Sequence, residues 1–272
     1  MQIQHSAVSL ENDPPKSNRL MWINDDRVLY VGLLGATSTR VLGAIAVYVS
    51  LGAPSRITID GGPWETADLA VVPAYVPHRI VGGTRMICNV LVEAETVDPD
   101  RLPAFLRRSG ALDEPAVAQR VRDAYARLLH AGRDVDLRGL DFDRELFGDL
   151  LTPRTIDPRI VSVLSQIKRD PSAHSAAEDS AESVHLSFSR FLHLFKQEVG
   201  VPYRSLRTWK RARSLLHYVT KESNLTHIAL DVGYPDSTHF SHSIRQVYGL
   251  APRDIFAGSR RLTLYGRTLA AA

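Results

Sequence analysis

Short apolar runs separated by turn-forming residues fill the first part of the chain. The runs lie at residues 28–34, 41–51, 56–60, 69–72 and 86–92, and turns containing glycine or proline separate them at 52–54, 61–63 and 82–83. Strands of this length with turns between them are typical of a small antiparallel barrel or sandwich. The pattern therefore predicts β-structure for residues 27–94.

The spacing of apolar residues changes after residue 102. A helix is predicted over residues 115–130, and one of its faces carries Val117, Val121, Tyr125, Leu128 and Leu129. This face either packs on the barrel of its own chain or forms the seam of a homodimer, and the pattern favours both equally. Residues 132–143 are polar and contain glycine, and we place the end of a linker at residues 152–154.

The strongest signal in the chain is an internal repeat in its C-terminal part. The first copy consists of Ala181, Val184, Leu186, Phe191, Phe195, Val199, Gly200 and Pro202, and the second of Ala229, Val232, Tyr234, Phe240, Ile244, Tyr248, Gly249 and Pro252. This spacing fits two helices joined by a tight turn, with a glycine that ends the second helix. Gly233 suits the turn of the second copy, whereas His185 in the first needs a turn that tolerates a side chain. The repeat predicts a pair of helix-turn-helix motifs.

An uninterrupted helical pattern joins the two copies. It runs from residue 203 to 220, and its apolar face consists of Leu206, Trp209, Ala212, Leu216 and Val219. At about 1.5 Å per residue this helix is roughly 27 Å long. Such a spacer holds two recognition helices about one turn of DNA apart, ~34 Å, so that they enter two adjacent major grooves of double-stranded DNA.

Charge is distributed unevenly along the chain. The whole sequence has 33 Lys and Arg against 30 Asp and Glu, a formal charge of +3. Residues 153–272 carry 17 basic and 10 acidic residues, or +7, which leaves −4 for residues 1–152. Because basic side chains that neutralise DNA phosphates release counterions, this asymmetry favours a C-terminal module that binds a polyanion. On charge alone, a basic face that serves only solubility is equally consistent.

The C-terminal motifs resemble those of the AraC/XylS family of bacterial transcription regulators. The matching stretches are His185–Ser187, Arg190–Gly200, Ile228–Tyr234 and Phe240–Gly249 with Pro252, preceded by Asp157-Pro158 at the start of a helix over 159–169. The similarity covers residues 157–256. Leu69–Arg79 also resembles the strand and turn of the family's cupin-like sensor barrels, which is a likeness of fold alone.

The resemblance implies an α+β protein with two domains. An N-terminal cupin-like antiparallel β-barrel that senses an effector is followed by a helical linker. An all-α C-terminal domain then holds two helix-turn-helix motifs joined by a long helix. We place the sensor at residues 1–100, the linker with a candidate dimerisation segment at 101–152, the DNA-binding domain at 153–258 and a tail at 259–272.

The second helix of each motif is expected to enter the major groove and to read bases. In the first copy the resemblance places the base readers at Ser189, Leu192 and His193. Leu192 either contacts a thymine methyl group or packs against the next helix. In the second copy, exclusion of the core-facing positions leaves a reading face that consists of Asp236, Ser237, Thr238 and His242. Asp236 either reads a base or caps its helix. His242 stands where the family more often has arginine, which favours weak base readout there.

Basic side chains beside these faces are predicted to contact DNA phosphates. In the first copy Arg190 and Lys196 flank the reading face. Thr226 is expected to cap the first helix of the second copy and to bind a phosphate through the exposed amides of that helix. The remaining candidates are Arg207, Lys210, Arg211 and Arg245.

The sensor offers few chemically distinctive residues. The candidates to line an effector pocket, each equally consistent with barrel packing, are Tyr48, Trp64, Tyr75 and Arg79. Among the first 152 residues only three histidines occur, His5, His78 and His130, too few to hold a metal between neighbouring strands. We therefore expect no metal, cofactor or catalytic residue. His78 is expected to cap a turn, and Cys88 to be a buried structural thiol.

These features favour a ligand-responsive transcription regulator in the cytoplasm. A single cysteine and an N-terminal stretch without a signal-peptide pattern indicate that compartment, and no apolar run is long enough to cross a bilayer. The expected partners are DNA, an unidentified small molecule, RNA polymerase and a second copy of the chain. The alternative is an interaction protein that has lost strong base readout. An enzyme is disfavoured because the sequence shows no nucleophile–base pair, phosphate loop or metal cluster.

Overall fold

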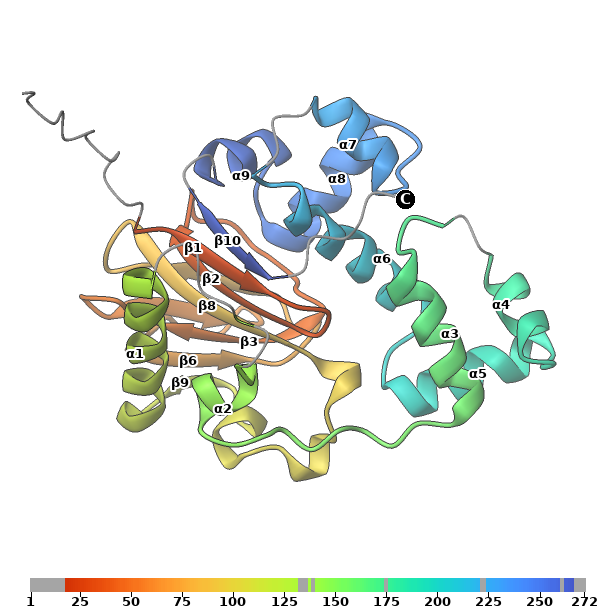
Figure 1. The fold of residues 1–272 in the computed structure, drawn as a ribbon, viewed down its shortest axis with the longest axis horizontal. Coiled ribbons are helices and arrows are strands. Elements are labelled where there is room, and N and C mark those ends of the chain that lie inside the picture. The colour runs from red at the N-terminus through yellow and green to blue at the C-terminus, as the bar shows by residue number, and fades with distance from the viewer. Residues whose placement is uncertain are drawn as a thin grey trace, which may run out of the picture.

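The computed structural model describes residues 18–131, 137, 140–173, 176–220, 224–259 and 262–266. Within these ranges a β-sheet domain lies beside a group of helices from the C-terminal half of the chain (Figure 1). The strands form a seven-stranded sheet in the order β10-β1-β2-β8-β3-β6-β9 and a three-stranded sheet in the order β5-β4-β7. Their bounds are β1 Leu20–Ile23, β2 Arg27–Leu33, β3 Ala44–Val49, β4 Ser55–Ile59, β5 Glu65–Ala67, β6 Leu69–Val72, β7 His78–Val81, β8 Met86–Glu93, β9 Gly110–Leu112 and β10 Thr263–Gly266.

The five predicted strands are all present, as β2, β3, β4, β6 and β8, and the large sheet is covered on both faces. This double cover explains why its central strands are apolar without alternation. β3 pairs antiparallel with both β6 and β8 and is buried along its whole length. Its residues Ala46 and Tyr48 lie in one hydrophobic core, while Ile45 and Val47 lie in a second core on the opposite face.

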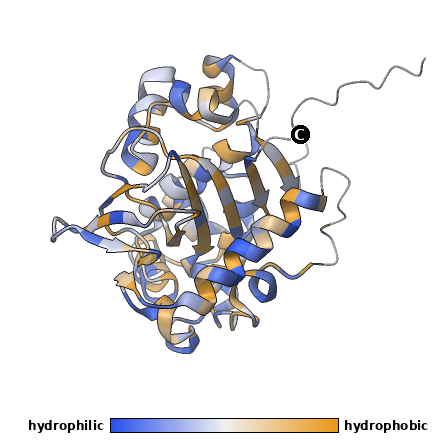
Figure 2. Ribbon diagram, turned by 90° about the vertical axis from the view of Figure 1, so that its left-hand side faces the viewer, coloured by the Kyte–Doolittle hydropathy of each residue, from blue (hydrophilic) through white to orange (hydrophobic). Residues whose placement is uncertain are grey.

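Helix α1 (Pro115–Ala131) and the short helix α2 (Phe142–Phe147) cover the second core. Ala118, Val121 and Leu128 of α1 are buried there. Figure 2 shows the largely apolar strands that lie behind this helix. The helix predicted over residues 115–130 is therefore confirmed, and it packs on the sheet of its own chain. Its role as a dimer seam stays a prediction.

The C-terminal helices form two helix-turn-helix motifs, as the repeat predicts. Their bounds are α3 Pro158–Arg169, α4 Ala177–Ser183, α5 Phe188–Val199, α6 Tyr203–Ser214, α7 Leu225–Asp231, α8 Ser237–Tyr248 and α9 Pro252–Ser259. Helices α4 and α5 make the first motif, α7 and α8 make the second, and α6 joins them. In the turn of the first motif His185 has a φ of 55°, and Gly233 in the second has a φ of 81°. A left-handed turn that carries a side chain is thus confirmed.

The connecting helix is shorter than predicted. α6 has 12 residues and ends at Ser214, where residues 215–217 tighten into a 3-10 turn. Its length is therefore about 18 Å instead of roughly 27 Å. Leu215 and His217 of the turn are buried. The chain leaves the α-helical path there because both side chains pack inward.

The C-terminal end of the helical domain returns to the sheet. β10 pairs in parallel with β1, so that Leu20 lies opposite Thr263 and Ile23 lies opposite Gly266. The ring of Tyr265 is buried in the second core, and its hydroxyl donates a hydrogen bond of 3.0 Å to the carbonyl oxygen of Leu128. Residues 263–266 of the predicted tail thus belong to the sheet, whereas the domain boundaries given above stay predictions.

The expected α+β class is confirmed, with a sheet domain followed by an all-α domain that holds two helix-turn-helix motifs. Among the helices of the described ranges, none has the length and apolar character needed to cross a membrane.

Candidate DNA-binding surface and interdomain cavity

The first helix-turn-helix motif has a core that leaves one face of α5 free. Phe191 and Phe195 are fully buried, and their rings lie 5.4 and 5.2 Å from the ring of Tyr203, measured between centroids. On the opposite side of α5, Ser189 and His193 are exposed. The packing therefore presents these two predicted base readers to the surroundings of the protein.

Three further residues of α5 flank this face. Arg190 and Lys196 are exposed, whereas Leu192 is half-buried against the core of the first motif. Leu192 therefore makes the packing contact that is the alternative to base reading. The DNA contacts of the four exposed residues on α5 stay predictions. All four belong to the exposed surface of this helix.

The second motif repeats this arrangement. Its core positions Phe240, Ile244 and Val247 are buried on α8. The predicted contact residues that remain exposed on this helix are Ser237, Thr238, His242 and Arg245. The face predicted to read bases thus lies on one exposed side of α8.

Asp236 caps α8. Its Oδ1 accepts hydrogen bonds from the backbone nitrogens of Thr238 and His239, both at 2.8 Å. Its Oδ2 lies 2.7 Å from Nδ1 of His239. The backbone hydrogen bond from His239, together with the contact to its ring, lowers the pKa of Asp236. Of the two interpretations of Asp236, the geometry favours the helix cap.

Substitutions at Asp236 separate capping from base reading. Asparagine also caps helices well, so we expect Asp236→Asn to retain both the melting temperature and the DNA affinity. Asp236→Ala removes the cap, and we expect its melting temperature to fall by a few degrees. Thermal melts and DNA titrations of both variants make the comparison. An asparagine variant that melts normally but loses its sequence preference would show that Asp236 reads a base.

The cap of α7 differs from the prediction. Asn224, and not Thr226, is the N-cap residue, and its Oδ1 accepts a hydrogen bond of 2.8 Å from the backbone nitrogen of Thr226. The prediction that Thr226 caps this helix is wrong because the helix begins at Leu225, so that Thr226 already lies within the first turn. A phosphate contact at this end of the helix stays a prediction.

The predicted phosphate contacts on α6 need a larger correction. Arg207 is buried and donates to the hydroxyl of Tyr203 at 3.4 Å and to the carbonyl oxygen of Ala173. Lys210 is buried as well. Arg211 is half-buried, and its guanidinium lies 5.6 Å from the centre of the Tyr234 ring. Arg207 and Lys210 therefore leave the set of exposed cations that can meet DNA in this arrangement.

A buried charged cluster joins α6 to the sheet domain. Glu93, at the end of β8, is 1% exposed, and its Oε2 accepts hydrogen bonds from Trp209 Nε1 and Lys210 Nζ, both at 2.7 Å. Its Oε1 lies 2.6 Å from Nε of Arg213. Lys210 also pairs with Glu95. Two carboxylates thus balance two cations inside the protein.

Burial and pairing oppose each other in this cluster. Burial raises the pKa of Glu95, and the attraction of Lys210 acts against this rise. Burial lowers the pKa of Lys210, but Glu93 and Glu95 together raise it by more. Trp209 also packs against Gly43, where an added Cβ would collide with the indole ring. The charges and the close approach both hold α6 against the sheet domain.

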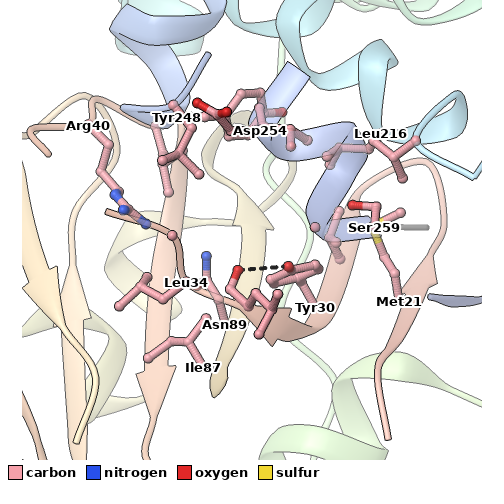
Figure 3. Close-up of a pocket in the computed structure, with 18 of the residues that line it drawn as sticks. Met21, Tyr30, Leu34, Arg40, Ile87, Asn89, Leu216, Tyr248, Asp254 and Ser259 are labelled. Carbon is pink, nitrogen blue, oxygen red and sulfur yellow. Dashed lines mark hydrogen bonds between the residues drawn. The ribbon is translucent and has the colours of Figure 1, made fainter. Parts of the chain in front are cut away.

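A cavity of about 600 Å³ lies between the sheet and the C-terminal helices (Figure 3). The sheet domain supplies one wall, which includes Met21, Tyr30 and Ile87. The opposite wall comes from the ends of α8 and α9 and includes Tyr248 and Ser259. A molecule in this cavity would therefore contact both domains.

Arg40, Tyr48 and Asn89 bring polar groups to the cavity wall. The hydroxyl of Tyr48 lies 2.7 Å from Nε2 of His78, whose Nδ1 lies 3.0 Å from the carbonyl oxygen of Val76. Because a carbonyl oxygen only accepts, Nδ1 carries the proton and Nε2 accepts from Tyr48. Burial lowers the pKa of His78 to about 4. The histidine is therefore a neutral structural group that orients Tyr48.

Of the four predicted effector residues, Tyr48 lines this cavity and the other three lie elsewhere. Trp64 is 37% exposed on the small sheet, with the guanidinium groups of Arg56 and Arg79 5.3 and 5.4 Å from its ring centre. Tyr75 is not among the residues of the cavity wall.

Cys88 is buried in the second core, and burial raises the pKa of its thiol to about 12. The structural role expected for this cysteine is confirmed.

Sequence reasoning missed Arg40, Asn89 and Glu93. Asn89 interrupts the apolar run 86–92, and Glu93 follows it directly. A polar residue within or at the end of a buried strand needs a partner, so these positions carried a usable signal. For Arg40 the only signal is its place next to the apolar run 41–51.

The helical domain matches a known protein family. A family model described as a helix-turn-helix domain matches residues 180–258, from the middle of α4 to the last turn of α9. The C-terminal part of the chain is therefore similar to helix-turn-helix domains of this family.

Two curated proteins are similar to part of the chain. Invasion protein InvF of Salmonella typhi is 35% identical over 75 residues, which are 27% of this chain and 35% of InvF. The HTH-type transcriptional activator RhaS of Citrobacter koseri is 28% identical over 153 residues, 52% of this chain and 54% of RhaS. The chain therefore spans between about a third and about half of the length of these relatives.

Solved structures of ToxT from Vibrio cholerae resemble the fold of the sheet domain and the helical domain together. An apo ToxT variant aligns with a TM-score of 0.60 at 12% identity, over 86% of this chain and 98% of ToxT. Wild-type ToxT with a bound unsaturated fatty acid aligns with a TM-score of 0.54 at 13% identity, over 86% and 96%. At these identities the likeness shows a shared two-domain fold.

Proposed function

We propose that the chain is a sequence-specific transcription regulator whose affinity for DNA depends on a small molecule bound between its two domains. The position of the cavity carries this proposal. One wall is the sheet, and the other includes Leu216, Tyr248 and Ile255 of the helical domain. A ligand that contacts both domains favours the arrangement in which it binds best, and thereby shifts the positions available to the recognition helices.

The named relatives support the two halves of this proposal separately. RhaS is a transcriptional activator, which supports activation by this chain. Contact with RNA polymerase in the cytoplasm is a further part of the proposal. One ToxT structure contains a bound unsaturated fatty acid, which supports a small-molecule effector. A homodimer on DNA belongs to the same proposal.

Selection of bound duplexes from a random pool tests the DNA-binding half. The full chain at near-physiological salt is expected to enrich a site with two short determinants about one helical turn apart, ~34 Å, one for each recognition helix. Retention of DNA without an enriched sequence would contradict sequence-specific binding. It would favour the alternative of an interaction protein, with its partner to be sought among other regulators.

Two substitutions on α5 distinguish base contacts from phosphate contacts. We expect His193→Ala to weaken binding to the selected site by about 1–3 kcal/mol while binding to random DNA is unchanged. Lys196→Ala is expected to weaken both alike and to reduce the slope of log affinity against log salt by about 0.9. Fluorescence anisotropy at several salt concentrations measures both effects.

Gln119→Ala, on the exposed side of α1, is the matched control and is expected to bind as the unmodified chain does. If His193→Ala weakens binding to random DNA as much as binding to the selected site, His193 is not a base reader.

A further inference from the structure

The second recognition helix has little permanent positive charge for a helix that is expected to enter a DNA groove. Arg245 is the basic residue of α8 with a fixed charge, and the cap residue Asp236 offsets it. Two histidines on the same helix, His239 and His242, are exposed. Histidine is the side chain whose charge changes between pH 5 and 8. The charge that α8 brings to DNA therefore depends on whether these two rings are protonated.

The contact between His239 and Asp236 determines which ring nitrogen carries the proton. Nδ1 of His239 lies 2.7 Å from Oδ2 of Asp236, and the side chain of His239 is 71% exposed. The backbone and ring of His239 lower the pKa of Asp236, so this carboxylate is ionised and only accepts hydrogen bonds. Nδ1 is therefore the protonated nitrogen. Nε2, on the opposite side of the ring, has no hydrogen-bond partner among the described residues.

This arrangement makes contact with a DNA phosphate dependent on a second proton. In the neutral ring Nε2 presents a lone pair, and a phosphate oxygen also only accepts, so the two groups repel each other. In the protonated ring, Nδ1 donates to Asp236 and Nε2 can donate to a phosphate. Both hydrogen bonds are then assisted by charge. His239 is thus suited to bind a phosphate only in its charged form.

The other carboxylates near α8 do not take the place of Asp236. Helices α6, α7 and α9 pack against α8. The acidic residues of these helices are Asp231 on α7 and Asp254 on α9, and Asp254 lies 3.6 Å from Arg253. Within the described ranges, Asp236 is the carboxylate that lies within 4.0 Å of His239. The ring therefore has one anionic partner, on its Nδ1 side.

The positive groups around α8 act against a further charge on this helix. His242 and Arg245 follow His239 on the helix at intervals of about one turn. On the packed helices, Arg204 and His227 are exposed and Arg211 is half-buried, while the remaining basic residues of α6 are buried. Neighbouring cations disfavour protonation of a histidine, whereas phosphates favour it. The negative field of DNA therefore supplies what the surrounding cations oppose.

We propose that His239 contacts a DNA phosphate through Nε2 and takes up a proton when it does so. This inference rests on the proposed function, because it specifies how one recognition helix is held on DNA. The affinity for DNA then rises as the pH falls, because the bound state holds a proton that the free state lacks. One proton changes the affinity by up to about tenfold per pH unit.

Calorimetric titration of the full chain with duplex DNA at pH 7.5, in HEPES and in Tris, counts this proton. The two buffers release a proton with different enthalpies, so the difference between the observed binding enthalpies gives the number of protons taken up. We expect the unmodified chain to take up about one proton more than His239→Gln, whose amide donates without titrating. Equal uptake by the two proteins would overturn the proposal.

The pH profile of DNA affinity distinguishes this contact from a structural role. Fluorescence anisotropy between pH 6.5 and 8.5 should show that the affinity of the unmodified chain falls as the pH rises. For His239→Gln we expect log affinity to fall less steeply, by about one per pH unit. A structural role of His239 predicts an equal loss of affinity at every pH, and parallel profiles would contradict the proposal.

Asp236→Asn tests the carboxylate that sets the tautomer, since this variant keeps the helix cap. The amide nitrogen of asparagine can donate to Nδ1 of a neutral ring, so that Nε2 carries the proton and donates to a phosphate. We expect normal affinity at pH 7.5 with about one proton less taken up. Full proton uptake by this variant would refute the tautomer on which the proposal rests.

His130→Gln makes the same replacement at an exposed histidine of α1 and is the matched control. It is expected to take up as many protons as the unmodified chain. A lower uptake by His130→Gln would contradict the assignment of the proton to α8.

A duplex of arbitrary sequence, titrated beside the selected site, separates this inference from the proposed function, because phosphates carry no sequence information. If no sequence is enriched but the arbitrary duplex binds with proton uptake through His239, the contact stands and sequence-specific regulation fails. If a site is enriched and is bound without proton uptake through His239, the regulator stands and the contact is refuted.

Discussion

Replacing Glu93 by glutamine is expected to lower the free energy of unfolding by about 3–5 kcal/mol, the usual cost of removing one partner from a buried ion pair. The carboxylate is 1% exposed and contacts Trp209, Lys210 and Arg213 on the same side of α6. Glutamine keeps the shape but not the charge, so two buried cations are left to share Glu95. Urea unfolding of the full chain measures the difference.

A matched surface substitution isolates the effect of burial. Glu145→Gln removes a carboxylate that lies 2.7 Å from Arg127. The arginine side chain in this pair is 58% exposed. Loss of the ion pair is therefore expected to lower the free energy of unfolding by less than about 1 kcal/mol. If Glu93→Gln and Glu145→Gln unfold at the same urea concentration, the buried cluster is not what holds α6 to the sheet.

The second large effect is a loss of stability in mild acid through His78. Its pKa is about 4 in the folded protein instead of the ordinary 6.5, with burial as the main cause. Between pH 4 and pH 6.5, His78 is protonated in the unfolded chain but stays neutral in the folded chain. The stabilisation is therefore complete above pH 6.5 and is lost as the pH falls to 4, by about 3 kcal/mol in total.

His78→Gln tests this assignment. Glutamine still offers a donor to Val76 and an acceptor to Tyr48 but does not titrate in this range. Unfolding free energies at pH 7.5 and 4.5 should differ by less in the variant than in the unmodified chain. All other titratable groups contribute equally to both proteins. The difference between their two slopes of unfolding free energy against pH therefore reports His78 alone. Identical slopes would assign the acid sensitivity to other groups.

The sequence predicted the parts of this fold that depend on local periodicity. The buried strands appear as apolar runs, and the two motifs appear as a repeat whose core residues, such as Phe191 and Phe240, are buried as expected. β1 pairs with the neighbouring β2, but it is only four residues long. β10 escaped prediction because its partner β1 lies more than two hundred positions away. No local pattern reports such a pairing.

The site was predictable only in part, for a related reason. Lys210 has the sequence context of a surface cation on a DNA-binding helix, yet its partners Glu93 and Glu95 lie more than a hundred residues earlier. Its burial depends on how two domains pack, which periodicity does not encode. The cavity likewise exists only where the sheet meets α9, so that the local sequence around Arg40 gives no indication of an open space beside it.

The parallel pairing of β10 with β1 also limits how the helical domain can move. The chain leaves the sheet domain before α3 and rejoins it at β10, and between these points the buried charges around Glu93 hold α6 against the sheet. A domain on one tether can tumble in any direction, whereas a domain attached at three separate places is confined to small displacements. Release of β10 alone would therefore leave the helical domain attached through α6.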